Sequence, residues 1–419
     1  MLVCPADHAF AADGPMVDPN VPEELGAERL MRFVQHLSVV IGPRRPASRA
    51  ERDAAAYVRE MIGQVNRQWE CIDQPFSTVD GFRYRVAPLA LLTSLSLLLG
   101  LRRNRQSRIV SGLLSIGLSV AARDIFLARP PIWETRLPRG KSQNVIVRIP
   151  PRHAVQRRIV FLAHLDSNSH HLSADPHVVR QLPHTVGSTT LMALVGGVLT
   201  VLAGKNQRWR VLRGLIAAGA LGGAALAIAD EMGPDVAGAN GNASGIAVLL
   251  GLAEALKKHP PEMTEVVLAF TGSASAVSTG ADVLATAFGP AWRDALWVVV
   301  SHVGTGELCW VTRHGISPYA YYAPHPAAVQ IMERVADARP DLGMMGKPLL
   351  SVDEVSILRD RDLRVVALMA YDRATGLISH WRQNSDTIHA ISPDTVERAA
   401  NACWTATRVM DQTDSWPLR

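Results

Sequence analysis

The sequence predicts an α/β protein whose mostly parallel, twisted sheet carries helices on both faces. Short apolar strands alternate with helical segments, in the order strand 159–162, helix 246–257, strand 265–270, helix 274–287 and strand 296–300. This alternation is typical of parallel sheets, because parallel strands need a helix-length connection between them. Flanking elements are expected as helices 23–36, 50–65 and 393–410 and as strands 76–86 and 144–149.

The first strand of this series ends in a histidine and an aspartate two residues apart, His164 and Asp166. In an extended chain, alternate side chains point to the same side, so this pair is expected to face one way. Open α/β sheets bind their ligands where strands end. The pair therefore predicts a site at the carboxyl end of the strand.

Composition, net charge and cysteine spacing limit the classes of function that this protein can have. The 419 residues are 48% hydrophobic and 19% charged, enough for a large α/β domain with insertions. The net charge of +5 comes from scattered arginines without a long basic run, so no nucleic-acid partner is expected, and anionic lipid suits this charge better. The cysteines lie too far apart for a zinc knuckle or a disulfide scaffold: Cys4, Cys71, Cys309 and Cys403.

Two pairs of apolar segments interrupt the α/β pattern. They cover 86–101 with 109–127, and 189–203 with 214–229. Each segment has 15–19 residues, at or below the ~20 residues that a membrane-spanning helix needs. A basic connection joins each pair, and the fourth segment carries Gly219 and Gly223 at a spacing that lets helices approach closely.

Membrane association is the preferred interpretation of these hairpins. The positive-inside rule would place their basic tips in the cytoplasm and leave the side of the globular part open. Shallow insertion into the interface and burial in a soluble core are the alternatives. No cleavable signal peptide is expected, because residues 1–22 are acidic and lack an apolar core. Paired glycines make a homo-oligomer an open possibility.

The expected organisation has three parts. Residues 1–22 form a loop-like segment, residues 23–411 form one α/β domain interrupted by hairpins 86–127 and 189–229, and residues 412–419 form a tail.

Five motifs in order give the chain a resemblance to a known family. They are Ala163-His164-Leu165-Asp166-Ser167, the Gly-Ala-Asn-Gly-Asn-Ala-Ser-Gly run at 238–245, Phe270-Thr271-Gly272-Ser273, the Val-Gly turn at 303–308, and the His-Trp-Arg-Gln run leading to Asp386-Thr387. This set resembles metallopeptidase family twenty-eight, the di-zinc exopeptidases related to aminopeptidases and glutaminyl cyclases. The resemblance covers roughly residues 25 to 411 and extends to members with inserted hydrophobic hairpins.

The resemblance implies a two-zinc centre, with a bridging carboxylate, two histidines, further acidic ligands and a glutamate as general base. His164 matches a ligand and Asp166 the residue that orients it. The remaining positions differ from the family pattern: the bridging aspartate falls on Gly241, the base and the acidic ligand on Ala274 and Ser275, another aspartate on Ser301, and the last histidine on Arg382. A guanidinium keeps its proton and cannot bind metal.

We therefore expect no zinc or other cofactor, a vestigial catalytic pair at Ala274 and Ser275, and a binding cleft at the following positions: His164, Asp166, Gly241, Ser275, Ser301 and Arg382. A rebuilt single-metal site could draw on further residues near these loops, with His170, His171 and His380 as the candidates and His302, Asp353 and His389 also available. A metal-free hydrolase would need Ser167, Ser275 or Ser301 beside His164.

The resulting hypothesis is a membrane-associated, aminopeptidase-like protein that has lost most zinc ligands. It binds a peptide, anionic, lipid or protein ligand, with Arg382 as an anion clamp. A hydrolase or cyclase with a single rebuilt metal, or none, is the enzymatic alternative. A structural subunit with its cleft packed shut is the third.

Overall fold

A computed structural model describes residues 21–102, 104–127, 129, 131, 133–137, 139–202, 207–317, 320–413 and 416. In these residues one nine-stranded sheet has the order β1-β2-β4-β3-β5-β9-β6-β7, with β8 beside β6. The strands are β1 Glu70–Thr78, β2 Gly140–Ile149, β3 Arg157–His164, β4 Thr264–Thr271, β5 Leu296–Val300, β6 Glu307–Ser317, β7 Ala320–Tyr322, β8 Met345–Pro348 and β9 Arg364–Tyr371. The expected N-terminal segment lies almost wholly outside the described residues, as does most of the tail.

The centre of the sheet is parallel and its edges are mixed. Strands β4, β3, β5 and β9 run parallel, whereas β2 pairs antiparallel with β4 and β6 pairs antiparallel with β9. The carboxyl ends of the four central strands therefore meet at one edge. This edge is where an open α/β sheet places its ligand.

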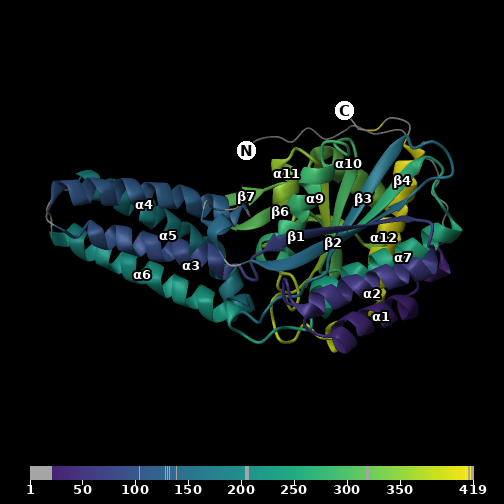
Figure 1. Cartoon of the computed structure of the whole chain (residues 1–419), viewed down its shortest axis with the longest axis horizontal. Coiled ribbons are helices and arrows are strands. Elements are labelled where there is room, and N and C mark those ends of the chain that lie inside the picture. Colours follow the sequence, from purple (N-terminus) through teal and green to yellow (C-terminus); the bar gives the residue numbers. More distant parts are fainter. Residues whose placement is uncertain are drawn as a thin grey trace.

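Helices cover both faces of the sheet (Figure 1). One apolar core joins the sheet to α1 Ala27–Gln35, α2 Arg49–Val65, α7 Ser244–Lys258, α10 Pro326–Ala338 and α12 Pro393–Gln412. A second core on the opposite face contains α9 Thr279–Phe288 and α11 Val355–Asp360. Buried side chains from all layers make this an α/β fold, as the sequence predicts.

Two helical hairpins project from the α/β body and pack together as a bundle (Figure 1). The first consists of α3 Arg83–Leu99 and α4 Arg105–Phe126, between β1 and β2. The second consists of α5 Pro176–Leu202 and α6 Gln207–Glu231, between β3 and α7. Strand β2 is antiparallel to β4, so its first residue lies at the carboxyl edge of the central strands. Both hairpins therefore leave from the edge that carries the predicted site.

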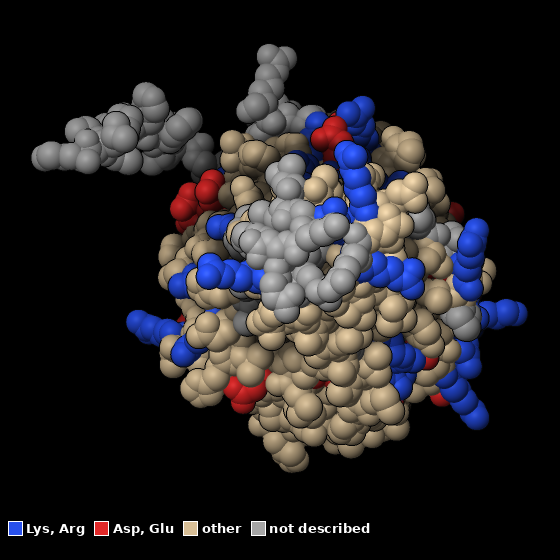
Figure 2. Space-filling model, turned by 90° about the vertical axis from the view of Figure 1, so that its left-hand side faces the viewer, with Lys and Arg blue, Asp and Glu red and all other residues tan. Residues whose placement is uncertain are grey.

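The bundle exposes much of its apolar surface. Most exposed large apolar side chains of the described residues lie on α3 to α6, including Leu95 at 54%, Leu113 at 63% and Leu215 at 65% exposure. Two segments, α4 and residues 214–231 of α6, are long and apolar enough to cross a membrane. In the apolar 18-residue stretch of each, 33% and 29% of the residues are buried. Lys and Arg side chains are seen around the hairpin end of the molecule (Figure 2).

Three expectations from the sequence are wrong in detail. The strand expected at 76–86 ends at Thr78, because a turn at Asp80-Gly81 leads directly into α3. The helix expected at 274–287 is divided into α8 Ala274–Val277 and α9, because Ser278 has a left-handed backbone with φ of 54°. Helix α5 begins at Pro176, thirteen residues earlier than the apolar segment, since its polar first turns carry no hydrophobic signal.

Candidate functional site

Five of the six predicted cleft residues lie at the ends of the central strands or in the segments that follow them. Strand β3 leads into His164 and Asp166, β4 into Ser275, β5 into Ser301, and β9 into the loop of Arg382. Gly241 lies just before α7, in a π-helical turn at Ala239–Ala243. The fold therefore brings residues from five distant segments to one edge of the sheet.

His164 is bonded at both ring nitrogens. Its Nδ1 lies 2.8 Å from the backbone oxygen of Asp166, and its Nε2 lies 3.1 Å from the backbone oxygen of Gly241. Carbonyl oxygens only accept hydrogen bonds, so the protonated form of the ring satisfies both contacts. Burial opposes the charge, but the Asp166 carboxylate outweighs burial and raises the pKa of His164 above its ordinary value.

Asp166 is completely buried and accepts several hydrogen bonds. The backbone N–H of Ala274 donates to one carboxylate oxygen at 2.8 Å, and that of Ser275 to the other at 2.7 Å. The Ser275 hydroxyl donates to it as well. Burial alone would raise the pKa of Asp166, but the bonds from His164 and Ser275 hold it below its ordinary value. Asp166 thus links the loop after β3 to the loop after β4.

Gly241 faces another buried carboxylate, that of Asp386. The backbone N–H groups of Asn240 and Gly241 donate to Asp386 at 2.6 and 3.2 Å. A β-carbon at position 241 would lie 3.1 Å from Asp386 Oδ2. Any side chain at this position would therefore begin in contact with the Asp386 carboxylate.

Ser301 lies beside His302, whose Nδ1 is 3.3 Å from the Ser301 hydroxyl. Burial, together with the charge on His164, lowers the pKa of His302 to about 3, so His302 is neutral. The rings of His164 and His302 lie 6.5 Å apart. Burial raises the pKa of a further acidic group, Glu354, to about 7, and Glu354 accepts a hydrogen bond from Thr271 at 2.6 Å.

Arg382 points from the site towards the base of the second hairpin. Its guanidinium lies 3.2 Å from His171 Nδ1 and 3.5 Å from the backbone oxygen of Ser275. Because a guanidinium only donates, His171 Nδ1 must accept and the ring is neutral. Burial, with added repulsion from Arg382, lowers the pKa of His171 to about 2, although Asp230 and Glu231 lie 3.9 and 3.6 Å away.

Arg44 is a site residue that the sequence analysis missed. Its buried guanidinium donates to the backbone oxygens of Leu165 and Ala237 and to the side chain of Asn242. Burial lowers the pKa of Arg44 to about 10, so it stays charged at neutral pH. Asn242 also donates to Leu165, so both side chains hold the loop after β3 against the loop before α7. The one local signal for this residue in the sequence is that Arg44 and Arg45 stand between two prolines, Pro43 and Pro46.

The residues at these positions do not fit a di-zinc centre. A zinc ligand must turn a lone pair towards the metal, whereas both nitrogens of His164 lie against backbone carbonyl oxygens. Glycine, alanine, serine and arginine occupy the positions of the other expected ligands. Among the residues described, no three His, Cys, Asp or Glu side chains are grouped to hold a metal ion. His170 and His171 follow β3, whereas His380 bonds Ser385 at the surface.

The three serines do not form a catalytic triad with His164. Ser275 donates to Asp166, Ser167 donates to the backbone oxygen of Val236, and Ser301 contacts His302. Since both nitrogens of His164 are bonded to carbonyl oxygens, neither can take a proton from a serine.

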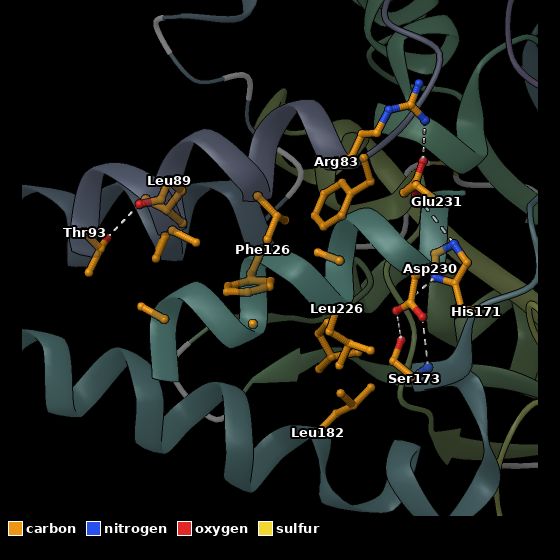
Figure 3. Close-up of a pocket in the computed structure, with 18 of the residues that line it drawn as sticks. Arg83, Leu89, Thr93, Phe126, His171, Ser173, Leu182, Leu226, Asp230 and Glu231 are labelled. Carbon is orange, nitrogen blue, oxygen red and sulfur yellow. Dashed lines mark hydrogen bonds and ion pairs between the residues drawn. The ribbon is translucent and has the colours of Figure 1, made fainter. Parts of the chain in front are cut away.

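A cavity opens on the hairpin side of Arg382. It has a volume of about 360 Å³ and lies between helices α3, α4 and α6 (Figure 3). Its polar lining includes Arg83, His171, Asp230, Glu231 and Arg382. Of the six predicted cleft residues, Arg382 is the one that lines this cavity.

Comparison with solved structures identifies the fold. A Zn-dependent exopeptidase from Parabacteroides distasonis has a TM-score of 0.54 at 14% identity, over 94% of this chain and 100% of the other. A Bacteroides thetaiotaomicron glutaminyl cyclase bound to N-acetylhistamine has a TM-score of 0.53 at 13% identity, over 94% of this chain and 100% of the other. A zinc aminopeptidase from Bacillus subtilis has a TM-score of 0.53 at 11% identity, over 91% of this chain and 94% of the other.

This chain has the zinc-exopeptidase fold. The resemblance inferred from the motifs is confirmed at the level of the fold, shared with exopeptidases and glutaminyl cyclases. No protein family model matches the sequence, and no curated protein matches it. At 11–14% identity, these similarities show the fold but do not indicate an activity for this chain.

The Asp166→Asn substitution should destabilise the fold by about 3–5 kcal/mol, because it leaves the His164 cation buried without its carboxylate. The free energy of unfolding, measured by chemical denaturation, reports the loss. Ser275→Ala is the control: it removes one hydroxyl donor from the same carboxylate and should cost about 1 kcal/mol. Equal losses in the two variants would contradict the role given to Asp166.

The neutral His171 makes stability fall on acidification. Below its ordinary pKa of 6.5 the unfolded chain takes up a proton at His171, whereas the folded chain does not until about pH 2. Stability should therefore fall by up to about 1.4 kcal/mol per pH unit below that point. Denaturation at pH 7 and pH 5 measures this, with His171→Gln as the control. A variant with the same pH dependence as the wild type would refute the assignment.

Proposed function

We propose that this protein is a membrane-associated, peptidase-like pseudo-enzyme that binds a ligand instead of hydrolysing one. The observation that carries the proposal is that His164 is the one expected zinc-ligand position that holds a histidine, whereas glycine, serine and arginine occupy the others. Both nitrogens of His164 also lie within hydrogen-bond distance of carbonyl oxygens. A di-zinc exopeptidase mechanism needs metal-bound water and a general base, and the base position is Ala274.

The cavity beside Arg382 favours a binding role over a purely structural one. The structural alternative, in which the cleft is packed shut, predicts no space around the guanidinium of Arg382. Instead, Arg382 lines a cavity of about 360 Å³, within the range of small-molecule pockets. Peptide, anionic and protein ligands are all compatible with a buried guanidinium.

Metal content tests the loss of the zinc centre. We expect the purified full-length chain and its His164→Ala variant to contain no stoichiometric zinc by elemental mass spectrometry. Neither should hydrolyse aminoacyl p-nitroanilides or cyclise N-terminal glutamine. Stoichiometric zinc that is lost in His164→Ala would overturn the proposal and direct the search for ligands to His170, His171 and His380.

The hairpins at 86–127 and 189–229 are the proposed membrane attachment. Their outward apolar side chains would face lipid, and their basic tips would lie on the cytoplasmic side. The chain should then stay with membranes through an alkaline carbonate wash. Release of the whole chain by that wash would indicate shallow insertion instead.

Thiol labelling tests the sidedness of this attachment. Cys71 is exposed on β1 and reports the α/β body, whereas Gln106→Cys, in a chain with Cys4 and Cys71 replaced by serine, reports a hairpin tip. A membrane-impermeant maleimide should label the two positions from opposite sides of sealed vesicles. Labelling of both from one side would exclude spanning hairpins.

A further inference from the structure

The cavity between the hairpins has one polar and one apolar end. Arg83, Asp230, Glu231, His171 and Ser173 lie together at the end that meets the α/β body (Figure 3). Away from that end the wall is apolar, with Leu89 and Phe126 from the first hairpin and Leu226 from the second. Thr93 also lines this part, but its hydroxyl donates to the backbone oxygen of Leu89. The apolar end therefore presents no free hydroxyl donor at Thr93.

Small residues of α6 create the space. Gly219, Ala220, Gly223 and Ala227 line the cavity from one helix. A β-carbon at Gly219 or Gly223 would meet no atom within 4 Å. Within the described part of this chain, these two glycines therefore bring no helix into close contact and face open space.

At the polar end, among the described residues, no carboxylate accepts a hydrogen bond from the Arg382 guanidinium, although the nearby charges of Glu231 and Asp230 favour its charged form. Asp230 accepts from the Ser173 backbone and hydroxyl, and Glu231 lies 3.6 Å from Arg83. Arg382, by contrast, donates only to neutral His171 and to a backbone oxygen, and its buried Nε has no hydrogen-bond partner. A buried charge is stabilised by an opposite charge that also accepts its hydrogen bonds.

We propose that this cavity binds a single-chain amphiphile, a fatty acid or fatty-acyl carboxylate. Its carboxylate would accept hydrogen bonds from Arg382, and its chain would lie along the glycine face of α6. The proposal rests on the binding role proposed above and names the ligand class for that role.

Two features favour this chemistry over related ones. The volume of about 360 Å³ is near the lower end for small-molecule pockets, which suits one acyl chain better than the two of a phospholipid. Asp230 and Glu231 lie at the same end and would repel a dianionic phosphate more strongly than a single carboxylate. A planar carboxylate also matches the geometry of a guanidinium.

Laurate binding to the full-length chain in phosphatidylcholine nanodiscs tests the proposal, with empty nanodiscs as the partition control. We expect one saturable laurate per chain, and affinity that rises about fourfold per methylene from octanoate to laurate. Dodecanol, which has the same chain without the charge, should bind more weakly. Laurate uptake no greater than that of empty nanodiscs would overturn the proposal.

Matched variants assign the binding to this cavity. Gly223→Leu places an isobutyl group where about three methylenes would lie, so it should weaken laurate binding more than tenfold. Gly222→Leu makes the same change on the same helix, also in open space but outside the cavity lining, and should bind as the wild type does. Unchanged binding in Gly223→Leu would refute this location. Circular dichroism confirms that both variants fold.

Different results would refute the role of Arg382, the ligand class and the loss of the metal centre. The Arg382→Gln variant should still bind dodecanol, but it should no longer prefer laurate over dodecanol. If the wild type binds both equally, the role of Arg382 is refuted. Absence of laurate binding in a zinc-free chain would refute only the ligand class, whereas stoichiometric zinc would refute the loss of the metal centre.

Discussion

The site edge of this protein depends on the buried pair of Asp166 and His164, in which the carboxylate favours the charged form of the imidazole. The carboxylate also accepts the backbone N–H groups of Ala274 and Ser275, so it joins two loops that follow neighbouring strands. In a zinc enzyme the metal makes such links between loops. Here a carboxylate and an imidazolium make one of them, and a charged imidazole has no lone pair to offer a metal.

Other buried polar groups complete the same edge. Arg44 connects the loop after β3 to the loop before α7, and Asp386 accepts from the turn that contains Gly241. Burial of such groups is tolerated because their hydrogen bonds are satisfied inside the protein. These contacts therefore hold the edge together with no acidic residue at positions 241, 274, 275 and 301.

The features predicted from the sequence are those with a local signal. An apolar strand that ends in His-x-Asp places His164 and Asp166, and apolar segments with basic connections place the hairpins. Arg44 and Glu354 were missed because their partners lie 121 and 83 residues away, at Leu165 and Thr271. No periodicity in the sequence encodes those pairings.

The cavity was unpredictable for a similar reason. Gly219 and Gly223 have the spacing of a tight helix contact, and only the relative positions of α3, α4 and α6 show that they face a space instead. The sequence also identified Arg382 as an added cation, but its direction depends on the loop after β9 meeting His171. Spacing identifies candidates, and packing decides what they contact.

Both hairpins leave the sheet at the edge that carries the site, and this has a consequence for access. In a bilayer, the bundle would place this edge next to the lipid, with the α/β body behind it. A molecule reaching Arg382 between the helices would then come from the membrane rather than from bulk water. Its local concentration would be governed by how strongly it partitions into lipid, so a sparingly water-soluble compound could saturate the site at a low aqueous concentration.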